Sequence, residues 1–182
     1  MVRSVIALLI ASAPVAAATA QTPTTGAWEL AQVPGGCMVH AASPQGTVLS
    51  IWAFAGQDKM GVLVQNKAWS SLEEGQDYQL KVSLGDKAWP VEATGRTNID
   101  ADGPGLFFSV APGKDSEQAG FFEALASAKG MNISGSGAAD DTVPLARSRE
   151  AMVSLARCLG DVWAGRDHDP GSAQPTAAGV EI

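Results

Sequence analysis

The two cysteines, Cys37 and Cys158, could form one disulfide, or one of them could be a reactive thiol. A reactive thiol needs a lowered pKa from a helix N-terminus or a facing cation. Cys158 lies late in a predicted helix, where the helix dipole disfavours a thiolate, and the adjacent Arg157 points to another face. Because the chain opens with a predicted signal peptide, the even cysteine count favours a Cys37–Cys158 disulfide over a catalytic or sensing thiol.

The segment NIDADGPG carries oxygen-bearing side chains at alternate positions. Asn98, Asp100 and Asp102 are followed by Gly103, which matches the first half of a calcium loop. The position of the bidentate carboxylate is taken by Ser109, inside a predicted strand. A turn rich in Asn and Asp between strands has the same composition. The turn is the favoured interpretation, and these three residues are the candidate metal ligands.

The other residues that could act in catalysis or metal binding lack the partner residues that such sites require. His40 lies in a predicted strand, where a hydrogen-bonded or surface ring is favoured over a catalytic base, and His168 stands in the acidic tail. The chain has no G-x-S-x-G sequence and too few ligands for zinc. The acidic pairs 73–74 and 140–141 and the run SGSG at 134–137 are typical of solvated loops and a turn. We therefore predict no catalytic residues and no cofactor.

Trp69 is the one tryptophan that the sequence singles out for binding. It lies in the polar segment QNKAWSSLEEG between two predicted strands. The strand-borne tryptophans are expected in the core, whereas an aromatic in a polar loop can anchor a partner. We expect Trp69 and its loop to be exposed and to contribute to a partner-binding surface.

The elements that must position these residues are mainly strands. Residues 47–56 alternate with apolar residues on both faces, which predicts a central strand. Residues 78–95 predict a hairpin with its turn at Gly85-Asp86, and Pro90 places the return strand at an edge or bulge. Shorter strands are expected at 28–32, 37–42, 60–65 and 105–111, and in MNISGSG and TVPLA.

Two helices complete the expected domain. The first should run for about three turns from an N-cap at Asp115, with Gln118 three residues later, to a stop at Gly130. The second should begin with Ser148 as its cap and carry one apolar stripe made of Met152, Leu155, Cys158, Leu159 and Val162. The predicted fold is α+β, mainly β, an antiparallel β-sandwich or open barrel of about seven to nine short strands covered by two helices.

The N-terminal segment and the net charge limit the location and the partners that the protein can have. Residues 1–20 have a basic residue, an apolar stretch and Ala18-Thr19-Ala20, which predict a secretory signal peptide. We expect one β-rich domain over 21–166, a disordered tail over 167–182, and a periplasmic or secreted location with no transmembrane segment in the mature chain. The net charge of −7 and the lack of a basic cluster argue against nucleic acid as a partner.

The last quarter of the chain resembles a known family. In FFEALASAKGMNISGSGAADDTVPLARSREAMVSLARC, an apolar helix leads to Ala128 and Met131, followed by a short strand, the apolar VPLARS, and Ala151 and Leu155 in a final helix. This stretch resembles the carboxy-terminal part of the invasion-associated locus B family of exported bacterial proteins. The resemblance implies a β-rich, non-enzymatic envelope protein linked to host contact, with no catalytic residues to transfer.

Two functions from different classes follow. The first is an exported, non-catalytic protein that binds a protein or envelope component through loops of a β-rich scaffold. The alternative is an inhibitor or effector acting on a cell-wall enzyme. An enzyme ranks third, and the oligomeric state stays open.

Overall fold

A computed structural model describes residues 27–111, 113, 116–135 and 141–165. The predicted signal peptide (1–20) and the predicted C-terminal tail (167–182) lie outside the described residues. Within the described part, no helix is long and apolar enough to cross a membrane.

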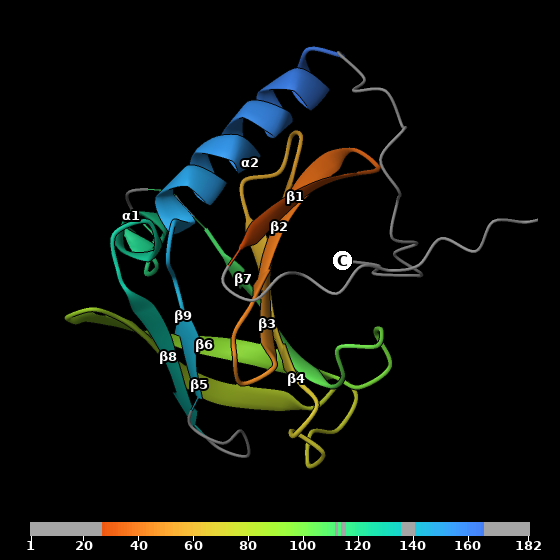
Figure 1. Cartoon of the computed structure of the whole chain (residues 1–182), viewed down its shortest axis with the longest axis vertical. Helices are drawn as coiled ribbons and strands as arrows, with labels where there is room; N and C mark the ends of the chain where they lie inside the picture. The colour runs from red at the N-terminus through yellow and green to blue at the C-terminus, as the bar shows by residue number, and fades with distance from the viewer. Residues whose placement is uncertain (1–26, 112, 114–115, 136–140, 166–182) are drawn as a thin grey trace, which may run out of the picture.

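Nine antiparallel strands form one sheet that curls into an open half-barrel, with two helices beside it (Figure 1). The predicted fold class is confirmed in its open-barrel form. The strands are β1 (Trp28–Val33), β2 (Gly36–Ala42), β3 (Thr47–Phe54), β4 (Met60–Asn66), β5 (Asp77–Leu84), β6 (Lys87–Arg96), β7 (Gly105–Val110), β8 (Gly130–Gly135) and β9 (Asp141–Pro144).

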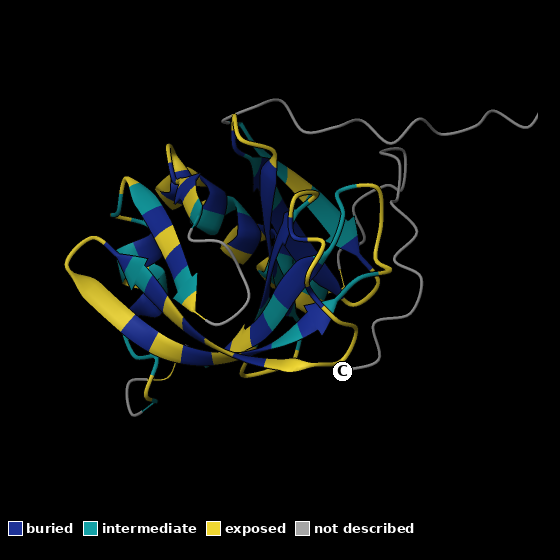
Figure 2. Ribbon diagram, turned by 90° about the horizontal axis from the view of Figure 1, so that it is seen from below, coloured by how far each residue is buried: buried dark blue, intermediate teal, exposed yellow. Residues whose placement is uncertain are grey.

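The sheet order is β1-β2-β3-β4-β7-β6-β5-β8-β9. The first four strands are a simple meander, and β3 is central and buried along both faces, as its two apolar faces predict. β5 and β6 form the predicted hairpin, in which Leu84 pairs with Lys87 and Gly85 takes a left-handed φ of 64°. Figure 2 shows the alternation of buried and exposed residues along these strands, which is the period-2 pattern of a half-buried sheet.

Pro90 lies in the half of β6 that pairs with a strand on one side only, where a missing N–H is tolerated. β6 pairs with β5 along its length but with β7 only over Thr94–Arg96, so the β7 side of Pro90 has no strand beside it. The predicted edge position is therefore correct for this half of β6.

Polar side chains, as well as the core, join β9 to β3 and β4 across the curled sheet. Asp141, at the start of β9, accepts hydrogen bonds from the hydroxyl of Thr47 and, at 3.2 Å, from Nδ2 of Asn66. Thr47 begins β3 and Asn66 ends β4, so these contacts join strands that are far apart in the sheet order. Thr47 is fully buried, and a buried hydroxyl of this kind needs its partner.

The first helix is shorter than predicted. α1 spans Phe121–Leu125 and follows Gly120, which has a left-handed φ of 77°. Asp115, the expected cap, lies outside the described residues, and the segment before α1 forms turns in which the Ser116 hydroxyl donates to the carbonyls of Ala111 and Gly113. A left-handed glycine cannot continue a right-handed helix, so the helix starts only after it. Phe121 and Leu125 still bury their side chains, as the apolar spacing predicts.

The second helix, α2 (Ser148–Trp163), lies across β1 and β2 (Figure 1). Its predicted stripe is confirmed, with Leu155 and Cys158 buried. The predicted cap is wrong: Ser148 is already the first helical residue, and its hydroxyl donates to the carbonyl of Leu125 at 2.7 Å. Arg147 occupies the cap position without a side-chain hydrogen bond to the helix backbone.

Candidate functional site

The disulfide predicted from the cysteine count is present. Cys37 of β2 and Cys158 of α2 are bonded, with their Cα atoms 6.2 Å apart, and both are buried. The alternative of a reactive thiol is wrong, since neither cysteine is free. The bond fixes α2 to the first meander, which orients every other side chain on that helix.

Trp69 does not lie on the surface. Its side chain is 4% exposed and belongs to the hydrophobic core, together with Leu72 three residues later. Successive turns fold the segment inward: the backbone N–H of Trp69 donates to the carbonyl of Asn66, and that of Leu72 donates to the carbonyl of Trp69. The expectation of an exposed anchor is therefore wrong, because backbone turns in a polar loop can point one aromatic into the core.

The turn containing Asn98, Asp100 and Asp102 is held from within the protein. Gln65, buried on β4, donates to the Asp100 carboxylate at 2.8 Å and to the carbonyl of Gly103 at 3.1 Å. The backbone N–H of Asp102 also donates to Asp100, as in an Asx turn. Burial, and then the negative charge of Asp100, raise the pKa of Asp102. No group of three or more His, Cys, Asp or Glu side chains among the described residues could hold a metal ion.

His40 pairs with a neighbouring strand. Its Nε2 lies 3.3 Å from a carboxylate oxygen of Glu29 on β1, so it occupies the hydrogen-bonded strand position that the sequence favoured. His168 lies outside the described residues.

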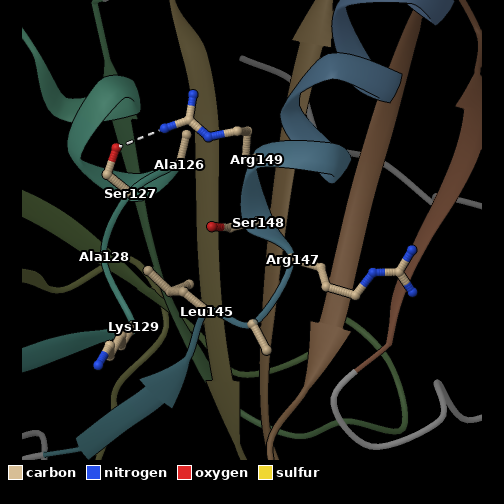
Figure 3. Close-up of a pocket in the computed structure, with 9 residues that line it drawn as sticks. Ala126, Ser127, Ala128, Lys129, Leu145, Arg147, Ser148 and Arg149 are labelled. Carbon is tan, nitrogen blue, oxygen red and sulfur yellow. Dashed lines mark hydrogen bonds between the residues drawn. The ribbon is translucent and has the colours of Figure 1, made fainter.

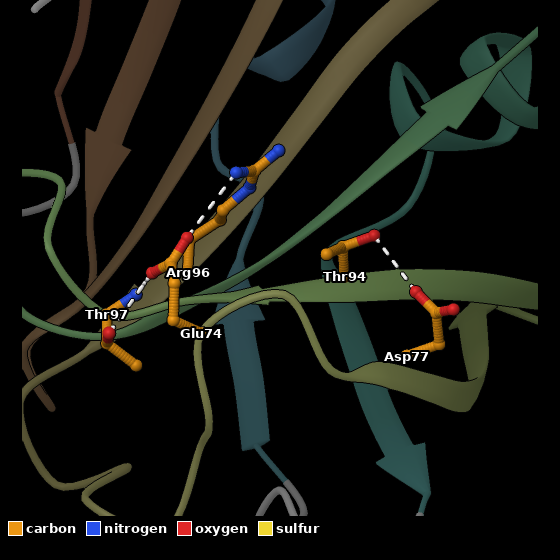
Figure 4. A network of polar contacts seen from close by, with 5 residues as sticks. All are labelled: Glu74, Asp77, Thr94, Arg96 and Thr97. Atoms are coloured by element: carbon orange, nitrogen blue, oxygen red, sulfur yellow. Dashed lines mark hydrogen bonds and ion pairs between the residues drawn. The ribbon is translucent and has the colours of Figure 1, made fainter. Parts of the chain in front are cut away.

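One member of each acidic pair has a structural contact. Glu74 accepts hydrogen bonds from the backbone N–H of Thr97 at 2.6 Å and from its hydroxyl, and lies 3.4 Å from the Arg96 guanidinium (Figure 4). The backbone hydrogen bond from Thr97 is the main cause that lowers the pKa of Glu74. Asp141 accepts hydrogen bonds from Thr47 and Asn66 across the curled sheet, and Asp140 lies outside the described residues.

A hollow at the start of α2 has three basic residues in its lining (Figure 3). The hollow, about 320 Å³, lies between residues 126–129, after α1, and residues 145–149, where the chain enters α2. Lys129, Arg147 and Arg149 line it, three basic residues in a chain that has only 12 and a net charge of −7. The sequence interpretation missed this cluster because Lys129 and Arg149 belong to separate elements.

The three side chains around this basic hollow point in different directions. The Arg149 guanidinium reaches across to the Ser127 hydroxyl at 3.2 Å, while Arg147 extends away from Ser127 and Lys129 (Figure 3). Arg147 pairs with Glu150 through its Nε at 2.8 Å, and this hydrogen bond raises the pKa of Arg147. Arg147 also has a φ of 62°, a left-handed conformation that costs a non-glycine residue about 1 kcal/mol or more and is often found at functional sites.

A second hollow, about 440 Å³, lies along the C-terminal half of α2 and is apolar. Met60 of β4 and Leu159 and Trp163 of α2 are among the residues that line it. Trp163 is 71% exposed, and the sequence interpretation missed it because the apolar residues of α2 were assigned to a single stripe.

No protein-family model matches the chain, and the comparisons with curated proteins and with solved structures found no similar protein or fold.

Proposed function

We propose that this protein is an exported, non-catalytic binding protein of the bacterial envelope, and that the basic hollow at the start of α2 receives an acidic group of its partner. The disulfide supports export, because such bonds persist in oxidising compartments and are rare in the cytosol. The resemblance of the last quarter to the invasion-associated locus B family supports the same assignment.

One observation supports the site more than any other: Lys129 and Arg149 flank the same hollow in an acidic protein. A carboxylate or another anion in this hollow would be attracted by both positive charges. Arg149 uses one of its five donors on Ser127, which leaves donors for a partner. Opposite charge at a small patch would steer an acidic partner to this hollow despite the overall negative charge.

The non-catalytic part of the proposal is supported by what the titratable groups already do. His40 contacts Glu29, Glu74 contacts Thr97, and Asp141 contacts Thr47. Each group bridges two elements of the scaffold. We therefore assign these groups to the stability of the scaffold that presents the hollow, and no reaction step to any of them.

The test is retention of envelope components by the purified, oxidised protein. Immobilised wild type is incubated with isolated cell-wall sacculi and, separately, with solubilised envelope proteins. The Lys129→Ala and Arg149→Ala double variant removes the two flanking cations. The matched control, Lys81→Ala with Lys87→Ala, removes two exposed cations from the β5–β6 hairpin. Wild type and control should retain the same component, with retention decreasing as salt rises.

The double variant should retain at least about tenfold less, a difference of about 1.4 kcal/mol in binding free energy. Equal retention by the two variants would overturn the site, and no retention above a blank resin would overturn the function. Recovery of a cell-wall hydrolase whose activity falls on binding would instead select the inhibitor alternative.

A further inference from the structure

Hydrogen bonds join the two walls of the basic hollow. The backbone N–H of Leu145 donates to the carbonyl of Lys129 at 3.0 Å. The buried Ser148 hydroxyl donates to the carbonyl of Leu125 at 2.7 Å. Both bonds connect the chain after α1 to the chain entering α2, so the separation of the walls is fixed by the fold. A hollow that is formed before its ligand enters binds at a lower entropy cost.

Ser127 fixes the orientation of Arg149 at the rim. The Ser127 hydroxyl donates to the carbonyl of Glu123 at 2.8 Å and accepts from Nη2 of Arg149 at 3.2 Å (Figure 3). Because a hydroxyl has one hydrogen, its bond to Glu123 directs a lone pair toward Arg149. The guanidinium still has a pair of parallel N–H donors, which is the arrangement that grips both oxygens of a carboxylate.

The lining combines cations with small apolar side chains. Ala126, Ala128, Leu145 and Ala146 supply the apolar part. None of the nine lining residues is Asp or Glu, although the chain has 19 of them. A purely apolar ligand would leave the cations without a partner, and a bare phosphate would leave the apolar part uncovered. The lining therefore suits a ligand with an anionic group beside small apolar groups.

We propose that the basic hollow binds a free peptide carboxyl terminus whose last residues have small apolar side chains. The carboxylate lies on Arg149 and Lys129, and the small side chains lie over the alanines. Arg147 takes no part, because it pairs with Glu150. The volume of about 320 Å³ is at the lower end for ligand sites, which suits about two alanine-sized residues. This inference rests on the proposed function and names the chemistry of the partner's acidic group.

The test is an NMR titration of the purified, oxidised, ¹⁵N-labelled protein with N-acetyl-alanyl-alanine, in its L,L and D,D forms. At the efficiency of ordinary small ligands, its about 14 non-hydrogen atoms correspond to a dissociation constant of about 1 mM. Amide signals from 126–129 and 145–149 should therefore shift and saturate by about 10 mM with at least one form. The carboxamide of the same peptide lacks the charge, and inorganic phosphate lacks the methyl groups. Each should bind at least about tenfold more weakly.

Variants separate charge from positioning. Arg149→Ala should weaken peptide binding by about tenfold, because it removes the paired donors. Ser127→Ala keeps every charge but releases Arg149, and should weaken binding by about threefold. Ser127→Thr keeps the hydroxyl and should bind like wild type. The matched control, Lys81→Ala with Lys87→Ala, removes two exposed cations elsewhere and should also bind like wild type. A melting temperature close to that of wild type checks the fold of each variant.

Several outcomes would overturn the inference: no saturable shift with either form of the peptide, equal affinity for the carboxamide or for phosphate, or binding that Arg149→Ala leaves unchanged. A protein that retains envelope components through Lys129 and Arg149 but binds no such peptide would overturn this inference alone. A protein that retains no envelope component would overturn the proposed function, so the two failures are distinguishable.

Discussion

The segment between β4 and β5 and the last two turns of α2 each carry a tryptophan, and the fold treats them in opposite ways. Trp69 stands in a polar segment and is 4% exposed, whereas Trp163 ends an amphipathic helix and is 71% exposed. The polarity of neighbouring residues would predict the reverse. Exposure at these two sites is decided by how the backbone is anchored.

The anchors of the two regions differ in kind. Around Trp69, the Asn66 side-chain carbonyl accepts from the N–H of Ala68, and the Tyr78 hydroxyl accepts from the N–H of Glu73. With Glu74 bound to Thr97, the segment is held in place along its length. α2 is anchored through its buried stripe and the bond at Cys158. A helix fixed along one side must expose the other, and Trp163 falls on the exposed side.

The largest expected effect breaks the anchor of α2. Replacing both cysteines, with Cys37→Ser and Cys158→Ser, should lower the free energy of unfolding by about 4–5 kcal/mol, because the bond closes a loop of more than a hundred residues. Urea unfolding measures the loss. Hydrogen exchange should show α2 losing protection before the segment at residues 67–76. Equal loss in both regions would mean that the bond stabilises the whole domain rather than the position of α2.

The second effect tests the anchor of the polar loop. Trp69→Ala should cost about 3–5 kcal/mol, the usual cost of truncating a buried aromatic, because it leaves a cavity among core side chains. Thermal unfolding followed by circular dichroism measures it. Trp69→Phe, which keeps a ring in the core, should lose clearly less. A loss below about 0.5 kcal/mol for Trp69→Ala would instead indicate a surface residue.

A smaller effect concerns pH and the same loop. Because the pKa of Glu74 is lowered in the folded protein, its contribution is present above its unfolded pKa and is lost as pH falls through the folded pKa. The Glu74 side chain is 46% exposed, so solvent screening limits this contribution to less than about 1 kcal/mol. Glu74→Gln should therefore unfold more easily than wild type near pH 7.

This difference between wild type and Glu74→Gln should shrink as pH falls through the lowered folded pKa of Glu74, where the wild-type carboxyl becomes protonated. Urea midpoints at several pH values measure it. Glu92→Gln, at another exposed glutamate, is the matched control. A difference that stays constant with pH would assign the effect to geometry rather than charge.

The smallest expected effect on stability is at the other tryptophan. Trp163→Ala should change the free energy of unfolding by no more than about 0.5 kcal/mol. The wild-type side chain is mostly exposed, so its removal loses little core packing. Chemical unfolding in urea measures this. A loss of stability close to that of Trp69→Ala would show that both tryptophan side chains contribute to core packing.

Much of the fold could be predicted because its signals are local. The two apolar faces of residues 47–56 and the turn at Gly85 each depend on a few neighbouring residues, and the observed strands match them within a residue or two. The first helix was predicted too long because Asp115 and Gln118 have the spacing of a helix start, whereas the described residues before Gly120 form turns. Ser148 has the composition of a cap, but a distant carbonyl, that of Leu125, provides a better partner than its own helix.

The candidate site was far less predictable. Lys129 follows α1 and Arg149 lies in α2, and nothing in either segment indicates that a shared hollow brings them together. In α2, periodicity predicted the stripe that faces the core, but it did not indicate that Val153 and Trp163 lie exposed on another side of the helix.

The sequence by itself determined the strands, the hairpin between β5 and β6, and the pairing of the two cysteines, because each follows from local periodicity, turn chemistry or a count that allows one bond. The tertiary structure decided the order β4-β7-β6-β5-β8, the burial of Trp69 and the exposure of Trp163. These features depend on contacts between residues far apart in the chain. Their free energies are set by packing between strands and helices that are distant in the chain, which no local pattern contains.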